Sequence, residues 1–310
     1  PADHSVVFRY NFRQQSDARL QDILADVRAG NLSAESKALL EARVNFPLPP
    51  ELNVDPPLVL ARRFHVDKMN AEKLRELPGA PTVFEYYWRD DPHKPTAINE
   101  KLKKMMLRSF PGMPELHLKI GAQVMHVIND KFSGKVNGSM GRVIAFDRAT
   151  HYPVVRFTDR TEHTIAPFKW KSQDGKCVLR QIPLIPAWAV TIHKIQGATL
   201  DCAKMDVGSN LFEHNMMYVA LSRVKTLQGI FLIAFDPRRA TCHPEAVEFY
   251  EYLRQAHEGE LVEEEEAEPE ELLLEDVLAD PDIATTRARP RMKLGGKRKA
   301  GQQSIKNYFS

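Results

Sequence analysis

The stretch AWAVTIHKIQGATL, residues 187–200, decides how the rest of the chain is interpreted. Its first six residues are largely apolar and are typical of a buried strand. His193, Lys194, Gln196 and Gly197 follow at once. In open α/β sheets, ligands lie outside the carboxyl ends of the strands, so these residues are expected to face a cleft. The alternative is an ordinary strand end with polar surface groups.

The four residues after this strand have the chemistry of a phosphate site. The cationic Lys194 and the imidazole of His193 suit phosphate oxygens, and Gln196 can bind a ribose or phosphate edge. Gly197 has no Cβ, so a ligand can approach its backbone closely. The stretch by itself does not decide between a ligand site and a plain strand end.

Helical and strand patterns surround this stretch. Residues 229–235 predict a second buried parallel strand, with a helix at 216–223 between the two. Residues 12–44 have the spacing of two helices, and a strand at 58–64 is followed by a helix at 66–77. Residues 116–128 predict one long strand or a strand pair. This alternation indicates an α/β fold with a parallel sheet and flanking helices.

Short β-like pieces interrupt the alternation. They lie at 141–146, 153–157, 162–167 and 176–183, separated by Asp-Arg and Asp-Gly turns. Such spacing is typical of a small antiparallel barrel. We therefore expect a barrel at about 142–183, inserted in the α/β fold.

Composition narrows the class of protein. The 310 residues are 43% hydrophobic, with a net charge of +2, and they contain no apolar run long enough to cross a bilayer. Acidic residues gather after residue 257, so the remainder is basic, which fits a polyanionic partner. Cys177, Cys202 and Cys242 have no metal-ligand spacing, which favours reduced thiols in an intracellular protein. The start, PADHSVVFRYNF, lacks Met and predicts a piece of a longer chain.

Two arginines are candidates for phosphate chemistry. Arg223 follows the apolar residues of the predicted helix at 216–223, and a buried arginine needs an anionic partner. That partner is either a carboxylate of the chain or a nucleotide phosphate, which a guanidinium reaches as an arginine finger. Arg13, in Phe12–Gln14 just before the first predicted helix, is a second such group.

The order of five segments carries a resemblance. They are FRQ (12–14), GAQVM (121–125), VNGSMG (136–141), IPAWAVTIHKIQG (185–197) and YVALSRVKTLQGIFLIAF (218–235). From residue 6 to residue 252 the chain resembles the carboxyl-terminal portion of PIF-one-type (petite integration frequency) DNA helicases. These belong to superfamily one and are RecD-like.

The resemblance implies a fold and a set of roles. It implies a second RecA-like helicase domain with an inserted SH3-like barrel, which works with ATP and Mg²⁺ and moves 5′ to 3′ on single-stranded DNA as a monomer. Arg13 and Arg223 would be catalytic arginines, and Gln196 and Gly197 would contact the nucleotide. The implied DNA contacts are Thr191, His193, Lys194, Lys169 and Lys171; Trp170, between the two barrel lysines, is either a further DNA contact or a packed core residue.

The sequence departs from the family pattern at several places. Ile195 replaces a usual Ser or Thr, His214–Met217 (HNMM) replace a usual Gly-Gln, and Arg63–His65 replace a more polar pattern. The 310 residues contain neither G-x-x-x-x-G-K-[ST] nor an Asp-Glu pair. The phosphate loop and the Mg²⁺ carboxylates would then belong to a preceding domain, and we expect the isolated chain not to hydrolyse ATP.

The last fifty residues have a separate organisation. Residues 258–280 are acidic and predict a disordered segment, and residues 287–299 are basic. The end, QQSIKNYFS, places Gln302, Ile305, Tyr308 and Phe309 in the order Q-x-x-[ILM]-x-x-[FY]-[FY]. This pattern resembles the box that binds the sliding clamp PCNA. It implies a replication-linked nuclear protein and leaves a mitochondrial destination open.

These observations predict four regions: 1–141 and 184–257 as the RecA-like domain, 142–183 as the barrel, and 258–310 as the tail. The main hypothesis is the carboxyl-terminal half of an ATP-dependent DNA helicase acting in replication, repair or telomere maintenance. One alternative is a non-enzymatic adaptor for DNA and PCNA, derived from a helicase. Another is the helicase part of a rolling-circle (Helitron-like) transposon protein.

Overall fold

The computed structural model divides the chain into two units, Pro1–Arg254 and Gln255–Ser310. It describes residues 11–253 apart from 51, 53, 91–99, 131–132 and 173–176. All that follows concerns these residues. The predicted tail, including the clamp-binding residues Gln302, Ile305, Tyr308 and Phe309, lies outside them.

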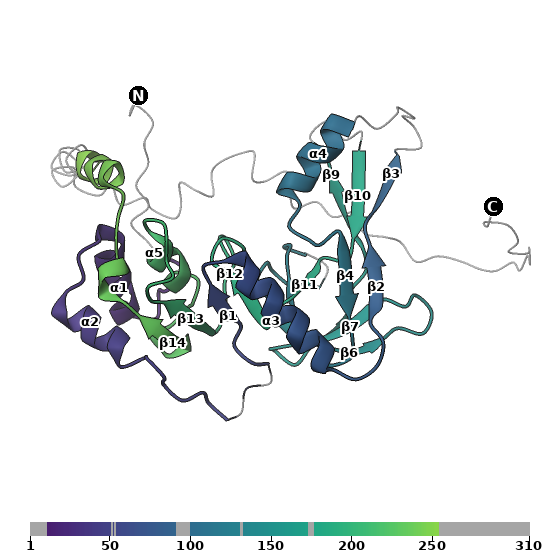
Figure 1. Ribbon diagram of the computed structural model, residues 1–310, viewed down its shortest axis with the longest axis horizontal. Helices are drawn as coiled ribbons and strands as arrows, with labels where there is room; N and C mark the ends of the chain where they lie inside the picture. Colours follow the sequence, from purple (N-terminus) through teal and green to yellow (C-terminus); the bar gives the residue numbers. More distant parts are fainter. Residues whose placement is uncertain are drawn as a thin grey trace, which may run out of the picture. The chain divides into compact units, whose positions relative to one another are not determined.

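A parallel sheet forms the centre of the α/β part (Figure 1). Its strands, in spatial order, are β12 (Ala189–Thr191), β1 (Leu58–Leu60), β13 (Ala203–Val207) and β14 (Ile230–Phe235). All neighbouring pairs are parallel, which confirms the predicted sheet and its strands near 58, 187 and 229. The carboxyl ends of all four strands therefore lie at one edge.

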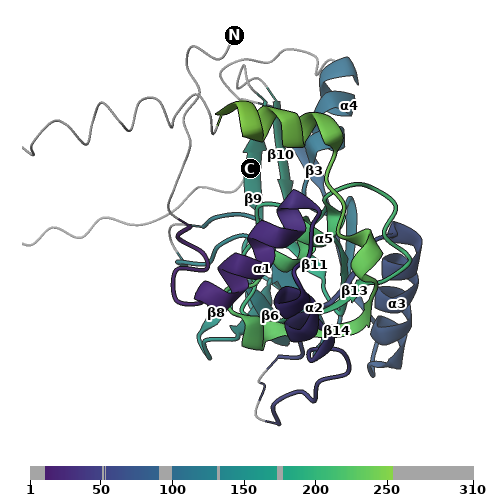
Figure 2. The same ribbon diagram turned by 90° about the vertical axis from the view of Figure 1, so that its left-hand side faces the viewer.

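Helices cover both faces of this sheet because alternate strand residues point to opposite sides. Figure 2 shows α1 (Ala18–Ala29) and α2 (Ala34–Glu41) on one side and α3 (Arg63–Glu76) on the other. Val59 and Val190 belong to the core on the α1 side, whereas Leu60 and Ala189 pack with Val66 of α3. The three predicted helices are thus confirmed. α5 (Met216–Leu221) lies against α1 and β13.

The first helix shows how the sequence sets its own limits. Asp17 caps α1, since its carboxylate accepts a hydrogen bond of 3.0 Å from the Leu20 N–H. Gly30 ends the helix in the left-handed conformation, at φ +74°. Between them the apolar residues recur every three or four positions, so one face is buried: Leu20, Ile23, Leu24 and Val27.

The antiparallel part contains three sheets. A five-stranded sheet has the order β11 (Leu184–Pro186), β5 (Gln123–His126), β6 (Met140–Phe146), β7 (Pro153–Phe157) and β8 (Glu162–Thr164). A three-stranded sheet has the order β3 (Tyr87–Asp90), β10 (Cys177–Gln181) and β9 (Phe168–Lys171), and β2 (Thr82–Glu85) pairs with β4 (Glu115–Leu118).

This arrangement differs in detail from four consecutive barrel pieces. β6, β7 and β8 share a sheet as expected, but that sheet also takes in β5 and β11, from outside residues 142–183. β10 pairs instead with β3 and β9. The run at 116–128 is two strands, β4 and β5, in different sheets. The short helix α4 (Glu100–Ser109) has no counterpart among the elements that the sequence pattern predicts.

An ion pair closes the β5–β6 loop onto the β7–β8 turn. The ammonium of Lys135 is buried, donates to the carboxylate of Asp159 and lies 4.8 Å from the ring centre of Phe157. This bond, followed by one from the Thr161 hydroxyl, lowers the pKa of Asp159 from 3.8 to about 2.

The pair gives a prediction for acid stability. A carboxylate with a lowered pKa stabilises the fold above its unfolded pKa, and the effect fades as pH falls towards the folded value. We expect Asp159→Asn to lower the free energy of unfolding at neutral pH, with the deficit narrowing as pH falls from about 5 to about 2. Urea unfolding of both proteins measures this. Lys135→Met removes the other partner of the pair, so its deficit should narrow over the same pH range. A deficit of Asp159→Asn that does not change with pH would contradict the assignment.

Candidate functional site

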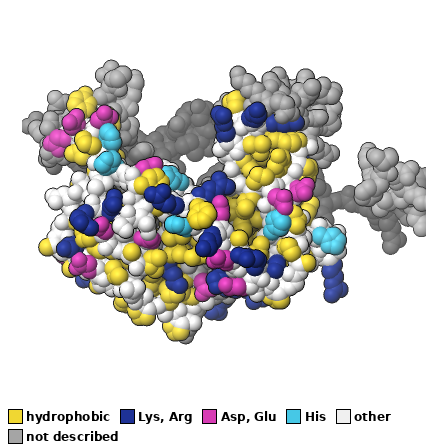
Figure 3. All heavy atoms as spheres, in the orientation of Figure 1, with side chains coloured by type: hydrophobic (Ala, Val, Ile, Leu, Met, Phe, Trp, Pro, Cys, Tyr) yellow, Lys and Arg dark blue, Asp and Glu magenta, His cyan; other side chains and the backbone are white. Residues whose placement is uncertain are grey.

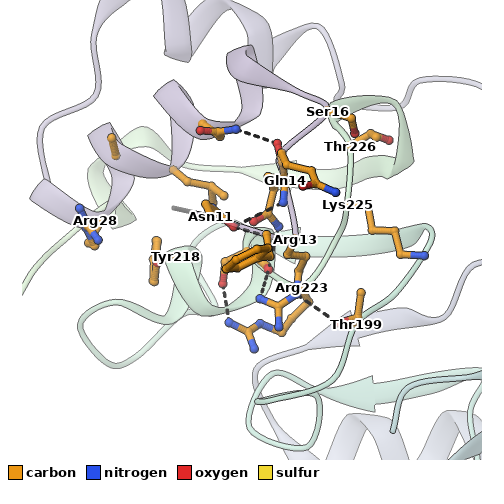
Figure 4. A pocket seen from close by; sticks show the side chains of 16 residues that line it. Asn11, Arg13, Gln14, Ser16, Arg28, Thr199, Tyr218, Arg223, Lys225 and Thr226 are labelled. Atoms are coloured by element: carbon orange, nitrogen blue, oxygen red, sulfur yellow. Dashed lines mark hydrogen bonds between the residues drawn. The ribbon is translucent and has the colours of Figure 1, made fainter. Parts of the chain in front are cut away.

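A pocket of about 920 Å³ lies where the chain before α1 meets the end of α5. Residues 11–16 and the side of α1 form one wall, and Thr199 with residues 218–226 forms the other (Figure 4). Two segments that are about 200 residues apart in the sequence, around Arg13 and Arg223, therefore share one cavity.

Arg13 is held in this pocket by neutral oxygens. Its Nε donates to the Thr199 hydroxyl at 3.1 Å, and its Nη1 donates to the Ser222 carbonyl at 3.1 Å. The second terminal nitrogen, Nη2, takes no part in these two bonds. The sequence makes Arg13 a candidate, and the structure shows what orients it.

Gln14 joins the two walls of the pocket. Its side chain is buried, and its amide donates to the Ser222 carbonyl at 3.1 Å and to the Val224 carbonyl at 2.6 Å. These carbonyls lie on either side of Arg223 in the chain. Gln14 therefore fixes the segment that carries Arg223 against the segment that carries Arg13.

Arg223 lies beyond the end of α5, which stops at Leu221, rather than inside a helix as predicted. Its Nε donates to the Val219 carbonyl at 3.0 Å and its Nη2 to the Ser222 hydroxyl at 2.7 Å. Burial, and after it the neighbouring Arg13, lowers the pKa of Arg223. Figure 4 shows the two arginine side chains next to each other.

Of the two alternatives for these arginines, the carboxylate partner is not found among the described residues. Within the described part of the chain, neither Arg13 nor Arg223 forms an ion pair with an acidic side chain. Of the described residues that line the pocket, four are basic and none is acidic; the basic ones are Arg13, Arg28, Arg223 and Lys225. Two guanidinium groups side by side in a partly dry pocket repel each other, and an anion relieves that repulsion. Lys225 is paired with Asp201, which does not line the pocket, at 2.7 Å. The chemistry of the remaining cations suits an anion.

The residues after β12 form a separate group. Thr191 ends the strand, and its hydroxyl accepts a bond of 3.1 Å from the Lys194 N–H, which turns the chain. Lys194 is half-buried and donates to the Pro111 carbonyl, and burial, then Arg63, lowers its pKa. His193 is exposed and faces the Glu213 carboxylate at 3.4 Å.

Gln196 and Gly197 do not line the pocket that holds the two arginines. Gln196 is exposed, and Gly197 has φ +82° with open space where a Cβ would stand. Thr199, two residues further on, is the residue of this stretch that reaches the pocket. The structure therefore brings Arg13 and Arg223 together and leaves the 191–197 turn beside them.

Lys169 and Lys171 lie elsewhere, on strand β9. Both are exposed and occupy one face of the three-stranded sheet, where Lys169 is paired with Arg180 and Lys171 with Val178. Trp170 points to the other face, with its ring edge-on to Phe110 at 5.0 Å between ring centres. Trp170 is thus packed, and the two lysines are the exposed groups of this strand.

Sequence reasoning missed three parts of the pocket. Gln14 could have been found from the sequence, because it directly follows the candidate Arg13 and precedes an apolar helix. Thr199 and Ser222 could not have been found in this way, because their roles depend on contacts with Arg13 across the fold.

In the described residues no group of His, Cys, Asp and Glu is placed to hold a metal ion, and no helix there is long and apolar enough to cross a membrane.

Comparison with known proteins supplies the family. No protein-family model matches the chain. The human ATP-dependent DNA helicase PIF1 is 35% identical over 251 residues, which cover 78% of this chain and 37% of the human protein. The Pif1 helicase of Bdellovibrio bacteriovorus is 31% identical over 252 residues, 79% of this chain and 54% of its own length. The chain is homologous to the Pif1 helicases.

Solved structures of Pif1 helicases agree with this assignment. The crystal structure of the Candida albicans Pif1 helicase matches with a TM-score of 0.60 and 30% identity, covering 79% of this chain and 60% of that one. A Bacteroides Pif1 helicase in complex with ADP-AlF3 and single-stranded DNA matches with a TM-score of 0.52 and 25% identity, over 80% and 56%. The chain spans about 37% of the human and 54% of the bacterial relative, so it corresponds to part of these proteins.

Proposed function

We propose that this chain forms the second motor half of an ATP-dependent 5′–3′ DNA helicase. In this proposal residues 1–141 and 184–257 are a RecA-like domain, and 142–183 are the main part of an SH3-like barrel. The observation that carries the proposal is the pocket with four basic residues and no acidic one among its described lining. A triphosphate is the anion that Pif1 homology favours for it.

Arg13 and Arg223 have the roles of catalytic arginines in this proposal. Phosphoryl transfer depends on positioning and on cations that neutralise charge developing on the γ-phosphate oxygens. Fixed guanidinium groups supply this without reorganisation at the moment of reaction. The described pocket lining offers no carboxylate, so the ligands for Mg²⁺, which neutralises the β- and γ-phosphates when bound, are expected outside it.

Single-stranded DNA is the proposed polymer substrate. Thr191, His193 and Lys194 lie at the carboxyl edge of the sheet, where α/β folds bind ligands. Lys169 and Lys171 are proposed as further phosphate contacts on β9. Gln196 and Gly197 are proposed to act on the nucleotide through the turn that leads to Thr199, because they do not line the pocket themselves.

Assays of ATP hydrolysis test the proposal that this chain supplies only one half of the ATP site. The purified 310-residue chain is expected to show no steady-state ATP turnover, because its sequence contains no phosphate loop. The full-length protein is expected to hydrolyse ATP only with single-stranded DNA present, and to unwind duplexes with a 5′ tail but not those with a 3′ tail. Turnover by the chain alone that is lost in Arg13→Ala would contradict the proposal.

The tail is proposed to bind the sliding clamp PCNA and so to place the protein in the nucleus, at replication, repair or telomeres. This rests on the order of Gln302, Ile305, Tyr308 and Phe309. A peptide of residues 297–310 is expected to bind purified PCNA in calorimetry, and the same peptide with Tyr308→Ala and Phe309→Ala is expected not to bind. A native peptide without affinity for PCNA would end this part of the proposal.

A further inference from the structure

The carboxyl edge of the parallel sheet, where His193 and Lys194 are proposed to contact DNA, also holds Arg62, Arg63, Phe64 and Phe212, which the roles above do not use. Because β12, β1 and β13 are neighbours and parallel, the residues that follow each strand meet at this edge. His193 and Lys194 follow β12, Arg62, Arg63 and Phe64 follow β1, and Phe212 lies in the loop after β13. Figure 3 shows Lys, Arg and His side chains beside apolar ones near the start of α3.

Two exposed aromatic rings stand in this group. The side chain of Phe64, in the first turn of α3, is 73% exposed, and that of Phe212 is 48% exposed. Phe212 joins the loops of two strands: the Arg62 guanidinium carbon lies 5.3 Å from the centre of its ring, and the His193 ring lies 6.4 Å from it. Neither ring belongs to the clusters of the buried core.

The charges around the rings favour a polyanion. Arg62, Arg63 and His65 lie within two residues of Phe64 in the chain, and the His193 ring lies 6.4 Å from that of Phe212. Lys194 follows His193 directly. Two of these groups face carboxylates among the described residues: Asp67 lies 3.3 Å from Arg63, and Glu213 lies 3.4 Å from His193. Both of these ion pairs are exposed and therefore weak. The edge therefore keeps a net positive charge, and its cations lie beside the exposed rings of Phe64 and Phe212.

We propose that Phe64 and Phe212 form a base-stacking ledge for single-stranded nucleic acid, with Arg62 and Arg63 on its phosphates. Bases present apolar faces and phosphates present charge, and a groove that combines aromatic rings with cations matches both. Double-stranded DNA shields its base faces, so the exposed rings select an unpaired strand. The ledge deepens the proposed helicase function and rests on it: it names bases, in addition to the backbone, as a feature that this edge contacts.

The test is the affinity of the 310-residue chain for a fluorescein-labelled dT15 oligonucleotide, measured by anisotropy at several salt concentrations. Phe64→Ala is expected to weaken binding about 5-fold to 150-fold. The slope of log K against log salt should not change, because every phosphate keeps its cation. Phe64→Trp should restore affinity. Arg62→Ala should make the slope shallower by about 0.7 for each phosphate that the variant no longer neutralises.

The control is Phe249→Ala, which removes a ring that is 53% exposed in the helical residues 244–253. It is expected to bind as the wild type does. If the wild type binds dT15 and Phe64→Ala binds equally well with an equal salt slope, the ledge is wrong and the helicase proposal stands. If the wild type does not bind dT15, the ledge is also wrong, and the helicase proposal is then decided by DNA-stimulated ATP hydrolysis of the full-length protein. Thermal melts of each variant establish that it is folded.

Discussion

Replacing Arg223 with alanine is expected to lower ATP turnover of the full-length protein by about 10³-fold to 10⁵-fold, the range measured for arginine fingers. Arg223 is one of two guanidinium groups in the pocket, and no acidic side chain among the described lining competes for it. Its bonds to Val219 and Ser222 fix its direction before a ligand arrives. The loss should therefore fall on the chemical step, visible in single-turnover hydrolysis, with nucleotide affinity changed much less.

Two variants make this result specific. Arg223→Lys keeps the charge but loses the planar fork, so most of the activity should still be lost. Arg238→Ala is the matched control, because Arg238 is exposed and paired with Asp236 at 2.9 Å, outside the pocket lining. If Arg223→Ala hydrolyses ATP at the wild-type rate, Arg223 has no catalytic role and is a structural residue only.

Replacing Gly138 with valine is expected to destabilise the chain by about 2–4 kcal/mol, from left-handed backbone strain and overpacking together. Gly138 has φ +100°, and a Cβ there would lie 2.7 Å from the Thr199 carbonyl oxygen. Thr199 holds Arg13, so the displaced turn should also disturb the arginine pocket. Urea unfolding of the purified chain measures the first effect, and single-turnover hydrolysis by the full-length variant measures the second.

Gly134→Ala is the control that separates the cost of left-handed backbone strain from the cost of the steric clash with Thr199. Gly134 lies in the same loop at φ +68°, but nothing stands within 4 Å of the position of its Cβ. It should lose the smaller, backbone part of the stability, about 1–3 kcal/mol, and leave hydrolysis unchanged. If Gly138→Val and Gly134→Ala are equally stable and equally active, the contact between Gly138 and Thr199 has no role in holding the pocket.

The sequence predicted helices and strands well where the apolar residues of an element recur at one regular spacing. The strand before His193 and the helices around residues 20, 36 and 70 are of this kind. β13 was missed although Ala203, Met205 and Val207 alternate with polar residues, a pattern that is itself typical of a strand. The structure explains Asp206, whose carboxylate accepts from the Gly208 N–H at 3.1 Å and from the Asn210 amide at 2.7 Å. Such polar contacts come from neighbouring turns and leave no periodic trace.

The candidate site was predictable in part and for a different reason. Arg13 and Arg223 were picked out by residue type and by resemblance, and the structure places them in one pocket. Nothing local connects Gln14 with Val224, or Thr199 with Arg13, because those contacts join distant segments. The pairing of β5 and β11 with the β6–β8 strands was likewise invisible, since register between distant strands is set by the assembled fold.

The wide sequence separation across the pocket has a consequence for how the protein is made. Arg13 and the carbonyl that orients it are 209 residues apart, and Gln14 and its second carbonyl are 210 apart. Contacts over such spans form late, because closing a long loop has to precede them. During synthesis Arg13 is made about 200 residues before Ser222, Arg223 and Thr226, which complete the lining of the pocket. The two arginines therefore come together only after the whole segment from Arg13 to Thr226 has been made.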